Sequence, residues 1–74
     1  MIKYKLNHIG YVVSSLEKSA DNFESAFGYE IESKEIADIN QDVIVQFLSH
    51  PSLPRIELIV PNSKQSPVQN ALKK

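Results

Sequence analysis

The stretch YKLNHIGYVVSSLEKSADNFESAFG, residues 4–28, decides the fold because a strand pattern runs directly into a helix pattern. Residues 4–14 read as a strand that is apolar on both faces after Gly10, which is typical of a strand covered on both sides. The alternation of side chains places His8 and Gly10 on the face opposite to Ile9. His8 is therefore expected to point away from whatever packs on the Ile9 face.

Residues 15–27 are predicted to form an amphipathic helix of about three turns. Ser15 suits the N-cap, because its hydroxyl can accept a hydrogen bond from a first-turn N–H group. Gly28 suits the left-handed position that ends many helices. The apolar stripe of this helix contains Leu16, Ala20, Phe23 and Phe27.

The remainder of the chain predicts three further strands and a short helix. Proline punctuation supports this division, since Pro61 should stop the last strand and Pro67 suits the first turn of a helix that Ser66 caps. The expected elements are strands at residues 29–36, 43–49 and 55–60, a polar turn at 37–42 and a short helix at 67–73.

These elements predict one α+β domain over residues 1–74. We expect a βαβββ module with a curved, four-stranded mixed sheet, one helix packed on one face and a short C-terminal helix. The strand at 55–60 would turn Ile56, Leu58 and Val60 toward the helix. His8 and Glu57 would then share the opposite face, which would form the wall of a cavity.

Composition excludes several classes of protein. The chain has 74 residues, 42% hydrophobic and 23% charged, and a net charge of −1. The basic residues are scattered, and no apolar run approaches the roughly 20 residues of a membrane span, so neither nucleic acid nor membrane is expected as a partner. The N-terminus lacks a signal-peptide pattern, which favours a cytoplasmic location. A module of this size buries only about 60% of its unfolded surface, and without cysteines it is expected to associate with another module.

His8 and Glu57 are the candidate metal ligands. Imidazole and carboxylate together suit Zn²⁺, Co²⁺, Mn²⁺, Ni²⁺ or Fe²⁺ better than Ca²⁺. Simpler interpretations exist, in which His8 is a strand histidine with a satisfied hydrogen bond and Glu57 is an exposed carboxylate that pairs with Arg55. His50 beside Pro51 fits a solvated turn better than a ligand position.

The chain resembles the vicinal oxygen chelate superfamily, the glyoxalase, bleomycin-resistance and dioxygenase group, and is most similar to methylmalonyl-CoA epimerase-like members. The resemblance covers nearly the whole chain. It is carried by LNHIG at residues 6–10, SLEKSADNFESAFGYE at 15–30, IELIVP at 56–61 and Ser-Pro at 66–67.

The resemblance implies that two βαβββ modules pair around a divalent metal, each giving the histidine of its first strand and the acid or amide of its fourth. By position these residues are His8 and Glu57. The other half of the site would come from a second module or from a second copy in a homodimer. The family's acidic base commonly precedes the third strand, where this sequence has Asn40; Asp42 is the nearest carboxylate and only a weak candidate. This departure argues against methylmalonyl-CoA itself as the substrate.

Three functions remain open at this point. The first is half of a metal-dependent lyase or isomerase that stabilises an enolate on a small acyl or α-hydroxy or α-keto substrate. The second is a single module that completes the same site by symmetric dimerisation. The third is a metal-free module of the bleomycin-resistance type that sequesters a small molecule, or an inactive fragment. The fold alone does not choose among them.

Overall fold

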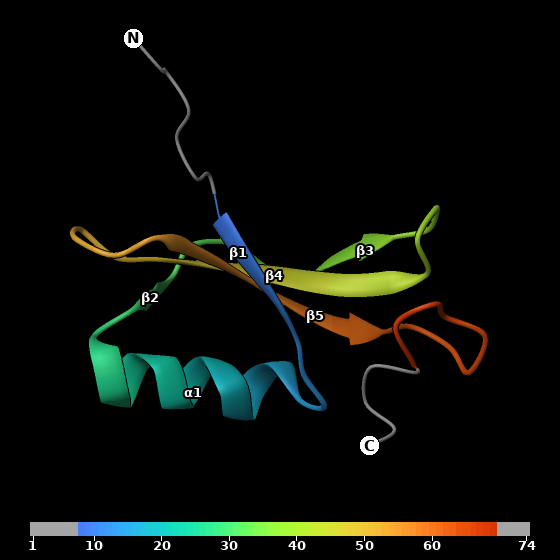
Figure 1. Cartoon of the computed structure of the whole chain (residues 1–74), viewed down its shortest axis with the longest axis horizontal. Coiled ribbons are helices and arrows are strands. Elements are labelled where there is room, and N and C mark those ends of the chain that lie inside the picture. Colours follow the sequence, from blue (N-terminus) through green and yellow to red (C-terminus); the bar gives the residue numbers. More distant parts are fainter. Residues whose placement is uncertain (1–7, 70–74) are drawn as a thin grey trace, which may run out of the picture.

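The structure is a computed structural model and describes residues 8–69. One helix lies against one face of a five-stranded mixed sheet, as Figure 1 shows. This confirms the predicted α+β class and βαβββ-like arrangement, with five strands in place of four. In chain order the elements are β1 (His8–Val12), α1 (Leu16–Phe27), β2 (Glu30–Ile31), β3 (Ile36–Asp38), β4 (Val43–Ser49) and β5 (Arg55–Pro61).

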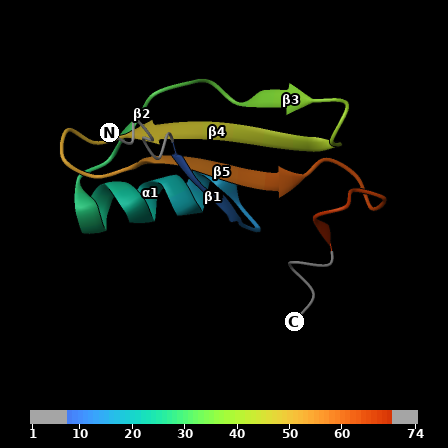
Figure 2. The same ribbon diagram turned by 45° about the horizontal axis from the view of Figure 1, so that its top comes forward.

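The sheet has the order β1–β5–β4–β2, and β3 pairs with β4 as well. β1 is an edge strand that runs parallel to β5, whereas the pairs of β4 with β2, β3 and β5 are antiparallel. A parallel pair needs a crossover connection, and α1 lies in the connection between β1 and β5. Figure 2 shows the helix on one side of the sheet, with the other side left open.

The core lies between α1 and the sheet. Leu48, Ile56 and Leu58 are 1%, 2% and 0% exposed, and they pack with Leu16 and Ala20 from the helix. This confirms the prediction that the even-numbered residues of β5 face the helix. The partly buried residues that complete this core are Ile9, Val13, Phe23, Ile44 and Val60.

Both predicted caps of α1 are present. The Ser15 hydroxyl accepts a hydrogen bond from the backbone N–H of Lys18 at 3.2 Å. Gly28 has a φ of 79°, and its N–H donates to the carbonyl of Glu24 at 2.9 Å. The helical stripe is less buried at its C-terminal end than predicted, because Phe27 is 57% exposed.

The predicted strand at residues 29–36 is wrong as a single element. The N–H groups of Glu32 and Ser33 both donate to the carbonyl of Phe47, at 2.8 and 3.3 Å, and the Ser33 hydroxyl accepts the Phe47 N–H. Serine competes with the backbone in this way and interrupts the ladder. The chain pairs with β4 again at Ile36, so that residues 32–35 stand opposite 46–47.

The other predicted elements differ mainly at their ends. The strand at 43–49 is confirmed, and the strand at 55–60 extends through Pro61. Of the strand predicted at 4–14, residues 8–12 form β1, and residues 4–7 lie outside the described residues. Most of the helix predicted at 67–73 lies outside them too, so it stays a prediction. No helix among residues 8–69 is long and apolar enough to cross a membrane.

Tyr29 joins the end of α1 to the turn before β5. Its side chain is 5% exposed, and its hydroxyl donates to the carbonyl of Pro54 at 2.7 Å. Its ring packs edge-on against Phe23 and lies 5.1 Å from the His50 ring. Burial raises the pKa of the Tyr29 phenol above its ordinary value of 10, and the Tyr11 phenol adds to the rise.

We expect Tyr29→Phe to remove part of the alkaline loss of stability. Because the pKa is raised in the folded state, the Tyr29 contribution is complete below about pH 10 and falls as the pH passes through the folded value. At neutral pH the variant should lose about 1 kcal/mol with the hydrogen bond to Pro54. Urea unfolding between about pH 8 and 11 measures both effects. Wild type at each pH is the reference, and an equal alkaline loss in Tyr29→Phe and wild type would contradict the prediction.

Candidate metal and substrate site

His8 and Glu57 meet on the open face of the sheet. The parallel register pairs His8 with Arg55 and Gly10 with Glu57, so His8 and Glu57 are diagonal neighbours. His8 Nε2 lies 3.0 Å from Glu57 Oε1, and the two side chains are 39% and 21% exposed. The two residues predicted as metal ligands therefore direct their donor atoms to one point.

Gly10 provides the space in which this pair meets. A Cβ atom at this position would lie 3.8 Å from Glu57 Oε1 and 3.3 Å from Ile59 Cδ1. The second distance is tighter than ordinary van der Waals contact, so the Ile59 side chain would have to yield. A larger side chain at position 10 would occupy the surface beside the Glu57 carboxylate.

Arg55 does not pair with Glu57, although the two share a face of β5. Its guanidinium binds Glu32 through Nε and Nη2, each 2.9 Å from a carboxylate oxygen. It also covers the ring of Phe47, with 4.1 Å between the guanidinium carbon and the ring centroid. The interpretation of Glu57 as a partner of Arg55 is therefore wrong, and Glu57 contacts His8 instead.

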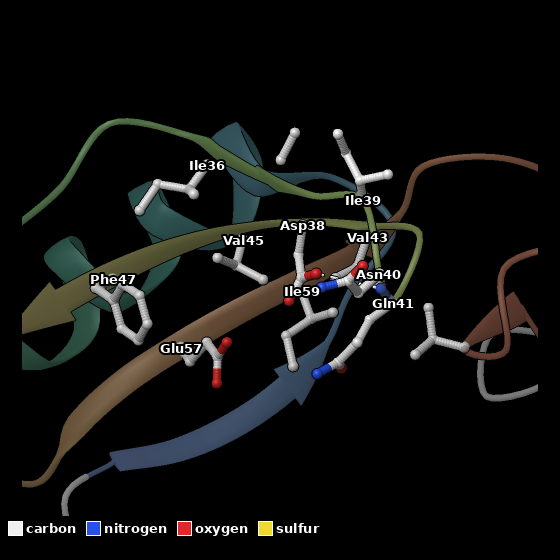
Figure 3. Close-up of a pocket in the computed structure, with 12 residues that line it drawn as sticks. Ile36, Asp38, Ile39, Asn40, Gln41, Val43, Val45, Phe47, Glu57 and Ile59 are labelled. Carbon is white, nitrogen blue, oxygen red and sulfur yellow. Dashed lines mark hydrogen bonds between the residues drawn. The ribbon is translucent and has the colours of Figure 1, made fainter.

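A hollow of about 780 Å³ extends from Glu57 along the open face. Figure 3 shows Glu57 and Phe47 at one end, Val45 and Ile59 along the floor, and polar side chains of the β3–β4 turn at the other end. The walls are largely apolar, with a few polar groups at the rim, which is typical of small-molecule sites. The lining residues are Ile36, Ala37, Asp38, Ile39, Asn40, Gln41, Val43, Val45, Phe47, Glu57, Ile59 and Val68.

The geometry of His8 and Glu57 fits two ligands of one metal ion. Two donors bound cis to a divalent metal at about 2.1 Å each lie about 3.0 Å apart in octahedral geometry. The observed separation of Nε2 and Oε1 is 3.0 Å. Within residues 8–69, no group of three or more histidine, cysteine, aspartate or glutamate side chains gathers around a common point. The described part of the chain thus brings the two predicted ligands together.

Asp42 serves the turn before β4 rather than the hollow. It has a φ of 55°, and its carboxylate accepts hydrogen bonds from the Ser63 hydroxyl and from Asn62 Nδ2 at 3.3 Å. Its backbone carbonyl accepts the Asn62 N–H at 2.9 Å. Asp42 is not among the residues that line the hollow, so these contacts favour a role in joining two loops.

Asp38 is the carboxylate that the sequence analysis missed. It lies at the end of β3 and lines the hollow, together with Asn40. One Asp38 oxygen accepts the Gln41 N–H at 3.2 Å, which is an Asx-type turn contact. The sequence contained one relevant signal: an aspartate three residues before Gln41 is placed to accept its N–H in a turn. The predicted turn at 37–42 nevertheless gave no reason to prefer Asp38 over Asp42.

His50 lies in the turn between β4 and β5, as the sequence indicated. Its Nδ1 accepts the backbone N–H groups of Ser52 and Leu53, at 2.9 and 3.2 Å. A nitrogen that accepts two hydrogen bonds within its own turn is engaged in local structure. These contacts agree with the solvated-turn interpretation of His50, and His8 stays the predicted ligand.

Residues 7–74 match the sequence profile of the Glyoxalase/Bleomycin resistance protein/Dioxygenase superfamily. The chain belongs to this superfamily, as the resemblance predicted.

The relatives named for an activity are epimerases. The mitochondrial methylmalonyl-CoA epimerase of Dictyostelium discoideum is 31% identical over 70 residues, which are 95% of this chain and 41% of that protein. The crystal structure of methylmalonyl-CoA epimerase from Mycobacterium tuberculosis superposes with a TM-score of 0.84 at 22% identity, over 100% of this chain and 52% of that one. A hypothetical protein, BH1468 from Bacillus halodurans C-125, gives a TM-score of 0.81 at 26% identity, over 93% and 49%.

The chain thus spans about half the length of the relatives it matches. This share agrees with one βαβββ unit out of two.

We expect Asp42→Ala to act on stability. The variant loses the hydrogen bonds from Ser63 and Asn62 and leaves alanine at positive φ, which together should cost about 1–2 kcal/mol of unfolding free energy. Asp21→Ala, on the exposed side of α1, is the matched control and should stay within about 0.5 kcal/mol of wild type. Urea unfolding measures both. Unchanged stability in Asp42→Ala would show that these contacts do not hold the loops together.

Proposed function

We propose that this βαβββ unit is one half of a divalent-metal enzyme of the epimerase or lyase type, in which His8 and Glu57 are the metal ligands. The observation that carries the proposal is the 3.0 Å approach of His8 Nε2 to Glu57 Oε1 at the end of an apolar hollow. The donor types suit Co²⁺, Ni²⁺, Zn²⁺, Mn²⁺ or Fe²⁺. The relatives named as methylmalonyl-CoA epimerases support an isomerase chemistry.

A bound metal would act as a Lewis acid that stabilises the negative charge on a substrate carbonyl oxygen when a neighbouring proton is removed. The residues of this chain supply the surroundings of that step. His8 and Glu57 would hold the ion, while Val45, Phe47 and Ile59 give the hollow apolar walls. A second unit that covers the open face would exclude water and strengthen the charge interactions there.

The proton must be taken by a base that reaches the hollow. Asp38 lines the hollow, whereas Asp42 does not, and one Asp38 oxygen is held by the Gln41 N–H. Asp38 lies at the end of the hollow away from Glu57, so we propose that it contacts the substrate and that the base beside the ion comes from the second unit. Asn40 lines the same end, and its amide can donate a hydrogen bond to a substrate oxygen but cannot serve as a base. A small acyl or α-hydroxy or α-keto compound suits this arrangement.

Two ligands bind a metal weakly, so a second βαβββ unit is proposed to complete the site. It would bring an equivalent histidine and glutamate, either from the same polypeptide or from a second copy related by a twofold axis. The relatives, about twice as long as this chain, support such pairing. A cytoplasmic location stays a prediction from the sequence.

Metal titration tests this proposal. Co²⁺ should bind at one ion per two His8–Glu57 pairs, measured by calorimetry and by the visible absorption of the bound ion. His8→Ala and Glu57→Ala should weaken binding by more than about a hundredfold, since even the loss of an outer-shell partner costs roughly 10- to 100-fold. His50→Asn is the matched control, because asparagine can still accept hydrogen bonds in the turn.

Sedimentation with and without Co²⁺ shows whether two chains complete the site. An assembly that is the same size with and without metal, and binds no Co²⁺, would exclude the proposal.

A metal-free binding protein is the second candidate. It is favoured by one observation: His8 and Glu57 contact each other directly, so the open face holds a paired histidine and carboxylate beside an apolar hollow. In that case, binding of an apolar fluorescent probe in the hollow should survive both a chelator and His8→Ala. Loss of probe binding under either condition would argue for the metal enzyme.

A further inference from the structure

Arg55 lies beside the proposed metal-ligand pair, because it is the register partner of His8. Arg55 and Glu57 are two residues apart on β5 and share the open face. The guanidinium carbon lies 4.1 Å from the centroid of the Phe47 ring, and Phe47 is the cross-strand partner of Glu57. The Arg55 side chain therefore extends along the strand to the level of Glu57.

A guanidinium at this place competes with a metal ion. Arginine forms two-pronged hydrogen bonds with carboxylates, and a cation near a metal site also repels the incoming ion. If Arg55 paired with Glu57, the carboxylate would be lost as a ligand. In the structure Glu57 contacts His8, and Arg55 is held by Glu32 through two contacts of 2.9 Å.

Glu32 is placed for this contact by the interruption of the sheet after β2. Its N–H and that of Ser33 both donate to the Phe47 carbonyl. Two residues opposite one form a bulge, and bulges redirect side chains. The backbone of Glu32 is thus fixed to the same residue whose ring lies under Arg55. The other neighbour of that ring is His8, at 5.8 Å with an angle of 83° between the planes.

We propose that Glu32 is a positioning residue for the metal site, because it holds the Arg55 guanidinium over the Phe47 ring and so keeps it away from Glu57. This role rests on the proposed function of His8 and Glu57 as metal ligands. The Glu32–Arg55 pair is partly exposed, with side chains 37% and 40% accessible, so it contributes little to stability. Its proposed effect is to keep Arg55 from pairing with Glu57.

The first test compares Co²⁺ affinity in the purified wild-type protein and in three variants. Glu32→Gln frees Arg55 to pair with Glu57 and should weaken Co²⁺ binding about fivefold, the equivalent of an exposed ion pair of about 1 kcal/mol. Glu32→Gln combined with Arg55→Gln should restore the wild-type affinity, because the competing cation is gone. Glu30→Gln, an exposed glutamate on β2, changes the net charge equally and should leave the affinity unchanged.

Urea unfolding of the same variants identifies those that fold as well as wild type. A purely structural role for Glu32 would leave the double variant at least as weak as the single one. That outcome, or wild-type affinity in Glu32→Gln, overturns the proposal.

The second test needs no metal. The chain has two histidines, so the His8 ring signals in an NMR spectrum are identified by their loss in His8→Ala. In Glu32→Gln these signals should shift, because Glu57 leaves His8 for Arg55, and in the double variant they should return. If the His8 signals do not shift in Glu32→Gln, Glu32 does not keep Arg55 away from Glu57 and the proposal is overturned. If the His8 signals shift in Glu32→Gln and return in the double variant, but wild-type protein does not bind Co²⁺, the proposed function is overturned and the effect of Glu32 on Arg55 stands.

Discussion

The parallel pairing of β1 with β5 is the constraint on which the rest of the structure depends. It joins the first and last strands described, and the chain between them must cross the sheet, which places α1 over one face. The same register sets Gly10 opposite Glu57 and brings His8 diagonally to the carboxylate. A shift of one residue would turn Glu57 into the core and Leu58 onto the open face.

The two faces of the sheet have different tasks. The face under α1 holds the fully buried residues Leu48, Ile56 and Leu58. The opposite face is apolar as well: Val43 and Val45 are 3% and 7% exposed there, and residues of the β3–β4 region line the same hollow. A module of this size has a small core, so an apolar face with the His8–Glu57 pair at one end suits association with a second unit.

The sequence predicted the elements that rest on periodicity and on caps. The stripe from Leu16 to Phe23, with Ser15 before it and Gly28 after it, located α1, and alternation located the strands at 43–49 and 55–60. Periodicity could not locate the break after β2, because it arises from a tertiary contact in which the Ser33 hydroxyl and two consecutive N–H groups engage Phe47. A local pattern does not contain that partner.

In the candidate site too, local features were predictable and tertiary contacts were not. The alternation of side chains along each strand, together with the family resemblance, located His8 and Glu57. The partners of Arg55 and Asp42 were not predictable, since Glu32 and Ser63 are distant in the sequence and reach them only through the folded sheet. Asp38 and Asp42 both lie in the predicted turn, two residues on either side of Asn40, and only the folded chain shows that Asp38 lines the hollow whereas Asp42 joins two loops.

The arrangement separates the proposed metal chemistry from substrate recognition. The ligands lie on β1 and β5, two paired strands whose backbones are fixed along their length, whereas Asp38, Asn40 and Gln41 come from the end of β3 and the turn that follows. Strands hold donor atoms more rigidly than turns do, and a metal site needs that rigidity. The turn could change its polar groups without moving His8 or Glu57, because among residues 8–69 its hydrogen bonds to the loop after β5 come from Asp42. Asparagine at position 40 is therefore compatible with the proposed metal pair, and under this proposal the turn would govern the choice of substrate.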